Sequence, residues 1–124
     1  TYEKNNKNVF LIEQAPMQLE KAKKIYFRSL HKDTEKYNYN LINHSLDLND
    51  HNILQNYVKK IFIEYEAKYS NLNLIKIEDI FCNKDLKKCL IGDHENSFYI
   101  DDNHLSVEGV ELIHNKISKI FNRF

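Results

Sequence analysis

Two short apolar runs, far apart in the chain, limit the fold more than any other feature of this sequence. Val9–Ile12 (Val-Phe-Leu-Ile), soon followed by Pro16, and Leu72–Ile77 (Leu-Asn-Leu-Ile-Lys-Ile) have the length and composition of buried strands. Between them, apolar residues recur at helical spacing. Strands joined through helices pair in parallel, so the sequence predicts an α/β fold with helices on the faces of a parallel sheet. Two strands are too few for a complete sheet, which indicates that part of the domain lies outside this sequence.

Three helices are predicted from the spacing of the apolar side chains. The first covers residues 17–30, the second ends near Tyr69, and the third begins at Ser106. Residues 31–49 are polar and aperiodic, and they predict a loop. The second helix has three candidate capping residues, Asp47, Asn49 and Asp50. It also carries an aromatic stripe that we interpret as core, formed by Tyr57, Phe62, Tyr65 and Tyr69.

The composition argues against several classes of function. The 124 residues fit one domain of ordinary size, and 18 basic residues balance 18 acidic ones, which removes the electrostatic reason to expect a nucleic-acid partner. The two glycines are isolated, so the clustered glycines of a nucleotide-phosphate site are absent, and we expect no cofactor. No apolar run approaches the ~20 residues of a membrane helix. The polar residues 1–8 are predicted to be a linker or a frayed end.

The densest chemical signal is the run Asp101-Asp102-Asn103-His104-Leu105-Ser106. A carboxylate three residues before a histidine, just ahead of a helix, can turn back and accept a hydrogen bond from the imidazole. It then fixes the tautomer, while the other ring nitrogen acts as a general base toward a hydroxyl. Asp101 has this offset from His104, and Asp102 is the alternative. A polar turn with Ser106 as helix N-cap explains the same residues without any chemistry.

The two cysteines, Cys82 and Cys89, lie in a segment, residues 80–97, that is predicted to be irregular. Six residues separate them, which is neither Cys-x-x-Cys nor the spacing of a zinc ribbon. A disulfide, two buried free thiols, and a zinc site completed by His94 and His104 are the alternatives. Five histidines share no spacing and are interpreted as surface or packed residues: His31, His44, His51, His94 and His114.

The run Tyr99–Gly109 (Tyr-Ile-Asp-Asp-Asn-His-Leu-Ser-Val-Glu-Gly) resembles the last conserved block of SGNH hydrolases, which holds their catalytic Asp-x-x-His. More narrowly, it is similar to the SGNH domain fused to membrane acyltransferases of family 3, the polysaccharide and peptidoglycan O-acetyltransferases. A strand ending near a proline, here residues 9–16, and a cysteine pair ahead of the block are shared features. The resemblance implies a partial three-layer α/β/α sandwich with a parallel sheet, SGNH-hydrolase-like and flavodoxin-like, whose N-terminal strands are missing.

The resemblance also implies roles for four residues. His104 would be the catalytic base and Asp101 its orienting acid. Cys82 and Cys89 would form a disulfide, because the similar domains are extracytoplasmic, with Cα atoms roughly 4.4–6.8 Å apart. Closing so short a loop contributes about 2.5 kcal/mol to stability in the chain-entropy model. The parent protein would be an O-acyltransferase, most simply an O-acetyltransferase, that modifies a cell-envelope glycan. Its glycan acceptor and acyl donor would be reached through the parent's membrane domain.

One part of the family pattern is absent from this sequence. No Gly-Asp-Ser block occurs, and a capping or surface role is the default for each serine: Ser29, Ser45, Ser70, Ser97, Ser106 and Ser118. The resemblance therefore makes residues 1–124 a single domain, the C-terminal portion of an SGNH-like domain without its nucleophile. We expect no activity from it alone, and a homo-oligomer through the truncated surface. An SGNH esterase or lipase-like hydrolase and a non-catalytic interaction module are the alternatives.

Overall fold

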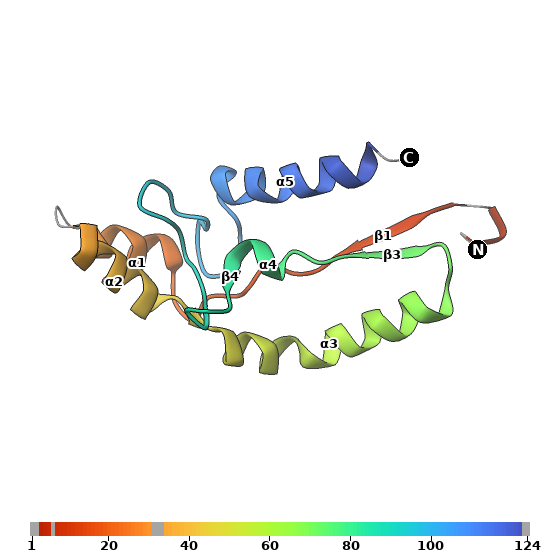
Figure 1. Ribbon diagram of the computed structural model, residues 1–124, viewed down its shortest axis with the longest axis horizontal. Coiled ribbons are helices and arrows are strands. Elements are labelled where there is room, and N and C mark those ends of the chain that lie inside the picture. Colours follow the sequence, from red (N-terminus) through yellow and green to blue (C-terminus); the bar gives the residue numbers. More distant parts are fainter. Residues whose placement is uncertain (1–2, 6, 31–33, 123–124) are drawn as a thin grey trace.

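Helices and short strands alternate in a mixed α/β structure (Figure 1). The computed structural model describes residues 3–5, 7–30 and 34–122. Its helices are η1 (Glu3–Asn5, 3-10), α1 (Ala22–Ser29), α2 (Thr34–His44), α3 (Leu48–Lys68), α4 (Glu78–Phe81) and α5 (Val107–Phe121). Its strands are β1 (Val9–Ile12), β2 (Leu46–Asp47), β3 (Leu72–Ile75), β4 (Cys82–Asn83) and β5 (Lys88–Cys89). The predicted linker, residues 1–8, falls partly outside the described residues.

The two predicted strands pair in parallel, as the sequence indicated. β1 and β3 run in register from the pair Val9 and Leu72 to the pair Ile12 and Ile75. The pair lies between α3 and α5 (Figure 1), and the ring of Phe10 on β1 contacts the ring of Phe121 on α5, with centroids 4.9 Å apart. Both strands end at the same edge, which is where open parallel sheets form their sites.

An antiparallel sheet was not expected from the sequence. β2, β5 and β4 pair in that order, although each strand is only two residues long. The segment predicted to be irregular, residues 80–97, therefore contains the end of α4 and the β4–β5 hairpin. Two-residue strands have no periodicity of their own, so only their pairing partners reveal them.

Two further predictions about the N-terminal half are wrong. The first helix begins at Ala22 and not near residue 17, because the extended segment before it bonds to distant parts of the chain, with the Gln18 N–H donating to the Asp102 carbonyl. The predicted loop, residues 31–49, contains α2 and β2; His31 lies outside the described residues. α2 is polar, but Leu41 is buried in the core and holds the helix against α1.

The core lies where α1, α4 and residues 89–99 meet. Its buried members are Ala15, Ala22, Ile25, Tyr26, Leu41, Ile75, Ile77, Phe81, Ile91, Phe98 and Tyr99. Ile113, Ile117 and Ile120 of α5 pack against this cluster, as the predicted stripe of that helix required. The core therefore fixes the loop 100–106 that connects Tyr99 to α5.

The aromatic stripe of α3 is not core, contrary to the prediction. Tyr57 is 75% exposed and Tyr65 is also exposed, whereas His51 on the same helix is buried. The face that packs inward carries His51, with Gln55 and Lys59 half-buried. Residues 61–62 of the helix, both apolar, are half-buried as well, so the inward side is mixed in polarity, which the apolar spacing could not indicate. No helix in the described part of the chain is long and apolar enough to cross a membrane.

Candidate active site

Asp101 and His104 form a hydrogen-bonded pair within a tight loop. The Asp101 Oδ1 atom accepts hydrogen bonds from the backbone N–H groups of Asn103 (3.0 Å) and His104 (2.7 Å). Its Oδ2 atom lies 2.8 Å from Nδ1 of His104. An ionised carboxylate can only accept, so Nδ1 carries the proton and Nε2 keeps its lone pair. This is the arrangement that a histidine base requires.

The same hydrogen bonds hold Asp101 in its charged form. The backbone N–H groups of His104 and Asn103, followed by the His104 ring, lower the pKa of the Asp101 carboxyl from 3.8 to about 2. Each of these donors is stronger toward a carboxylate than toward a neutral acid. Asp101 therefore stays negative over the whole range in which a histidine changes its charge.

We expect the stability of the chain to depend on pH through Asp101. Its folded pKa lies below the value of 3.8 in the unfolded chain, so the unfolded state binds the proton more readily. The stabilisation is fully present above about pH 5 and is lost as the pH falls through 3.8 toward about 2. Urea unfolding at several pH values should therefore show a steeper acid loss in the wild type than in Asp101→Asn. The control is Asp102→Asn, whose side chain is exposed; an equal loss in Asp101→Asn would contradict this assignment.

The imidazole lies at an open surface. The His104 side chain is 75% exposed, and it lines a shallow depression of about 640 Å³. The other walls of the depression are mostly apolar and include Ile12, Ile77, Ile100 and Ile113. They come from the carboxyl ends of both parallel strands, from the loop and from α5. The base thus faces a space where a second reacting group could approach.

Asp102 does not share the role of Asp101. Its side chain is exposed, and its backbone carbonyl accepts a hydrogen bond of 2.7 Å from the N–H of Gln18. The carboxylate with the three-residue offset, Asp101, is the one that contacts the imidazole. Asp102 holds the loop through its main chain.

The residues after His104 start helix α5 as the sequence predicted. The Ser106 Oγ atom accepts a hydrogen bond of 3.1 Å from the Gly109 N–H, so Ser106 is the N-cap, and it donates to the Ser97 carbonyl at 2.6 Å. A Cβ atom at Gly109 would lie 2.2 Å from the Phe98 carbonyl oxygen. Serine and glycine at this spacing therefore serve the close packing of α5 on the strand-like segment 98–100.

The described serines do not complete a triad. The hydroxyls of Ser29 and Ser45 donate to carbonyls four residues earlier, and the hydroxyl of Ser97 donates to Tyr99. Ser118 lies 3.3 Å from Nε2 of His114 on the exposed side of α5. Among the described residues, no serine hydroxyl is hydrogen-bonded to His104. The described structure therefore brings Asp101 and His104 together without a serine partner.

A family comparison accounts for this arrangement. The family model described as "SGNH domain (fused to AT3 domains)" matches residues 1–119. The chain belongs to this family. No curated protein and no solved structure matches the chain. The resemblance to the SGNH domain fused to membrane acyltransferases of family 3 is therefore confirmed, and the mixed α/β structure agrees with an SGNH-like fold.

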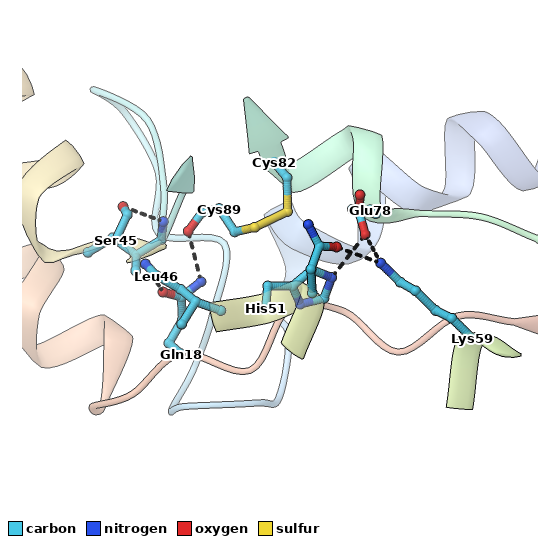
Figure 2. The surroundings of a disulfide bond; sticks show 10 residues. Gln18, Ser45, Leu46, His51, Lys59, Glu78, Cys82 and Cys89 are labelled. Atoms are coloured by element: carbon cyan, nitrogen blue, oxygen red, sulfur yellow. Dashed lines mark hydrogen bonds and ion pairs between the residues drawn. A yellow bond between two sulfur atoms is a disulfide. The ribbon is translucent and has the colours of Figure 1, made fainter. Parts of the chain in front are cut away.

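In this SGNH-family chain the two cysteines form a disulfide (Figure 2). Cys82 of β4 and Cys89 of β5 face each other across the hairpin, with Cα atoms 3.8 Å apart. The distance is shorter than the expected range. Cys82 and Cys89 are directly opposite partners in a non-hydrogen-bonded pair, next to the hydrogen-bonded pair Phe81 and Leu90, and such a pair already brings Cα atoms to about 4.5 Å.

The zinc alternative is wrong for this site. Both thiols are consumed in the disulfide, and the exposed His94 pairs with Glu95 at 3.4 Å. Among the described residues, no group of three or more histidine, cysteine or acidic side chains is arranged to hold a metal ion. The free-thiol alternative is excluded by the same bond.

A second polar cluster lies beneath the disulfide and was not found from the sequence. His51, which is 2% exposed, places Nε2 3.2 Å from Glu78 Oε2, and Lys59 pairs with the same oxygen (Figure 2). Burial lowers the pKa of His51, and the charge of Lys59 adds to this. Desolvation raises the pKa of Glu78, but the hydrogen bond and charge of Lys59 outweigh it. The cluster ties α3 to α4.

Proposed function

We propose that this chain supplies the base and the orienting acid of an acyl-transfer site in an O-acyltransferase. The observation that carries the proposal is the 2.8 Å contact between Asp101 Oδ2 and His104 Nδ1, with the imidazole exposed beside a depression. Membership of a family fused to AT3 domains supports an acyltransferase setting. The serine of the relay would come from a segment that this sequence does not contain.

Each step of the proposed reaction assigns one task to His104. Its Nε2 atom accepts the proton of the serine hydroxyl as the serine oxygen attacks the acyl carbonyl. The imidazolium, stabilised by Asp101, then returns the proton to the leaving group. In the second half, Nε2 takes the proton of a sugar hydroxyl as its oxygen attacks the acyl-serine. The bond between the acyl carbon and the serine oxygen then breaks, and the imidazolium returns the proton to that serine oxygen. With water in place of the sugar, the same site is an esterase.

The remaining features of the proposal concern the setting of the domain. We take residues 1–124 as one domain, the C-terminal portion of a three-layer α/β/α sandwich of the flavodoxin-like type. A disulfide is typical of an oxidising compartment, which supports an extracytoplasmic position next to a membrane domain. The acceptor would be a cell-envelope glycan, the transferred group most simply acetyl, and the donor would arrive through the membrane domain. A homo-oligomer through the truncated surface remains part of this proposal, and the edge of β1 that no described strand pairs with and the exposed apolar side chains of α3 are candidates for that surface.

The test compares ester turnover by this chain with turnover by a longer protein that includes the upstream serine block. We expect the chain alone to be inactive on an aryl acetate, because an oxyanion site and a nucleophile are missing. The longer protein should hydrolyse the ester, and a glycan acceptor should divert the acyl group from water to sugar. Hydrolysis without diversion would favour an esterase, and activity in neither protein would favour an interaction module.

A further inference from the structure

Gln18 is a buried polar residue that connects the antiparallel sheet to the segment before α1. It is 3% exposed. Its Oε1 atom accepts a hydrogen bond of 3.0 Å from the Leu46 N–H on β2, and its Nε2 atom donates to the Cys89 carbonyl on β5 at 3.1 Å (Figure 2). Both ends of the side-chain amide are therefore engaged. Losing either bond would leave a buried backbone group without a partner, which is costly.

The backbone of the same residue holds the loop of the candidate active site. The Gln18 N–H donates to the Asp102 carbonyl at 2.7 Å, and the Ala22 N–H donates to the Asp101 carbonyl at 3.0 Å. These two bonds fix the main chain of Asp101 and Asp102, shortly before His104. Asp101 in turn bonds the imidazole. A displacement of Gln18 must therefore move the carboxylate that orients the base.

The disulfide holds the opposite end of this connection. Cys89 is fully buried and pairs with Leu46 on one side and with Cys82 on the other, where the disulfide closes the hairpin. The carbonyl that receives the Gln18 amide belongs to this same cysteine. The connection thus runs from the disulfide through the Cys89 carbonyl and Gln18 to the loop that carries Asp101.

We propose that Gln18 is a positioning residue that couples the disulfide hairpin to the Asp101–His104 pair. The inference rests on the proposed function for its catalytic meaning, while the coupling itself is a property of this chain. With the hairpin closed, the backbone of Gln18 holds the loop through its bond to the Asp102 carbonyl. Within the loop, the Asp101 carboxylate holds the backbone N–H groups of Asn103 and His104. Opening the hairpin or removing the amide frees Gln18 from β5 and β2, so its backbone bond to Asp102 is no longer anchored to the antiparallel sheet.

The first test replaces the amide without changing the length of the side chain. Gln18→Met keeps the backbone N–H but loses both side-chain bonds, and Gln14→Met, at an exposed position of the same segment, is the matched control. In Gln18→Met we expect the amide hydrogens of Asn103 and His104 to exchange about tenfold faster. The Asp101 carboxyl, followed by NMR, should titrate closer to 3.8 than to about 2. Unchanged exchange and titration in Gln18→Met would overturn the proposal.

A second test starts from the wild-type chain and uses reduction of the disulfide. Reduction of the disulfide in the wild-type chain should accelerate exchange of the same two amides, while the amides of β1 and β3 stay protected. In Gln18→Met, reduction should change the exchange of these amides little, because the connection through the side-chain amide is already lost. If the effects of reduction and of Gln18→Met on exchange simply add, the two act independently, and the coupling is overturned. Reduced wild-type chain with an undisturbed loop would overturn it as well.

Failure of the proposed function gives a different result. If an active longer protein keeps its turnover after His104→Ala, the catalytic role of the pair is wrong, whatever the exchange rates show. If His104→Ala abolishes turnover but Gln18→Met leaves both turnover and the loop unchanged, only the positioning role is wrong. The expected pattern is a loss of turnover in Gln18→Met that parallels the loosening of the loop, with Gln14→Met unaffected.

Discussion

Replacing His104 with alanine should lower ester turnover by about 10²–10⁴-fold in a longer protein that carries the serine block, because this is the usual contribution of a positioned general base. The structure gives the reason for so large an effect. Asp101 holds the imidazole at 2.8 Å in the tautomer that leaves Nε2 free, and nothing else near the depression, among its lining residues, is a neutral base of similar strength. Turnover of an aryl acetate at neutral pH measures the loss.

The matched control is His94→Ala. His94 is an exposed histidine at a short distance in sequence, and its ion pair is with Glu95. We expect its removal to leave turnover unchanged within about twofold, since surface substitutions away from a site have small effects. Equal losses in both variants would indicate damage to the fold, and a His104→Ala protein with wild-type turnover would contradict the assignment of the base.

Reducing the disulfide should lower the free energy of unfolding by about 2.5 kcal/mol and the melting temperature by about 10 °C. The bond closes a loop whose cysteines are separated by seven positions in the sequence, so the unfolded chain gains freedom when it opens. The hairpin beside α4, in which Cys89 is buried, also loses its fixed geometry. Thermal unfolding followed by circular dichroism, with and without reductant, measures the shift.

A Cys82→Ser and Cys89→Ser double variant provides the control for the reductant itself. Its melting temperature should be low and should not respond to reductant. Thiol titration of the denatured, unreduced wild-type chain should detect no free thiol. Two free thiols in protein never exposed to reductant would contradict the disulfide and remove the support it gives to an extracytoplasmic position.

Features with a local signal were predictable from the sequence. β1, β3 and α5 each have a complete apolar pattern, and the structure places all three as predicted. The pairing of Asp101 with His104 was predictable too, because a three-residue offset and a following N-cap are enough to bring the side chains together. The serine was missing from the sequence, and the described structure brings no substitute to the imidazole.

Features that depend on distant partners were not predictable. The hydrogen bond from Gln18 to Cys89 joins residues 71 positions apart. It holds Gln18 outside the helix that local spacing favours from residue 17, and α1 begins at Ala22. β2 consists of two residues whose only signal is their pairing with β5. In both cases tertiary contacts outweigh local propensity.

The prediction that the aromatic stripe of α3 belongs to the core was wrong for another reason. The spacing correctly indicated a helix, and it also indicated an apolar face, but it could not indicate which face the rest of the chain covers. The buried His51 and the half-buried Lys59 both pair with Glu78 of α4 from the other side of the helix. An apolar stripe therefore predicted the helix and misplaced the core.

The edge of β1 that no described strand pairs with lies next to the depression that His104 lines. Among the described strands, β1 pairs only with β3, so its other edge can accept one more strand. A parallel strand added there would lie about 4.8 Å away and would leave the sheet at the level of Glu13, which lines the same depression as His104. The loop that follows such a strand would therefore begin beside this depression. If the proposed function is right, the hydrogen-bond register of the added strand along the edge of β1 would set how far its loop reaches toward His104.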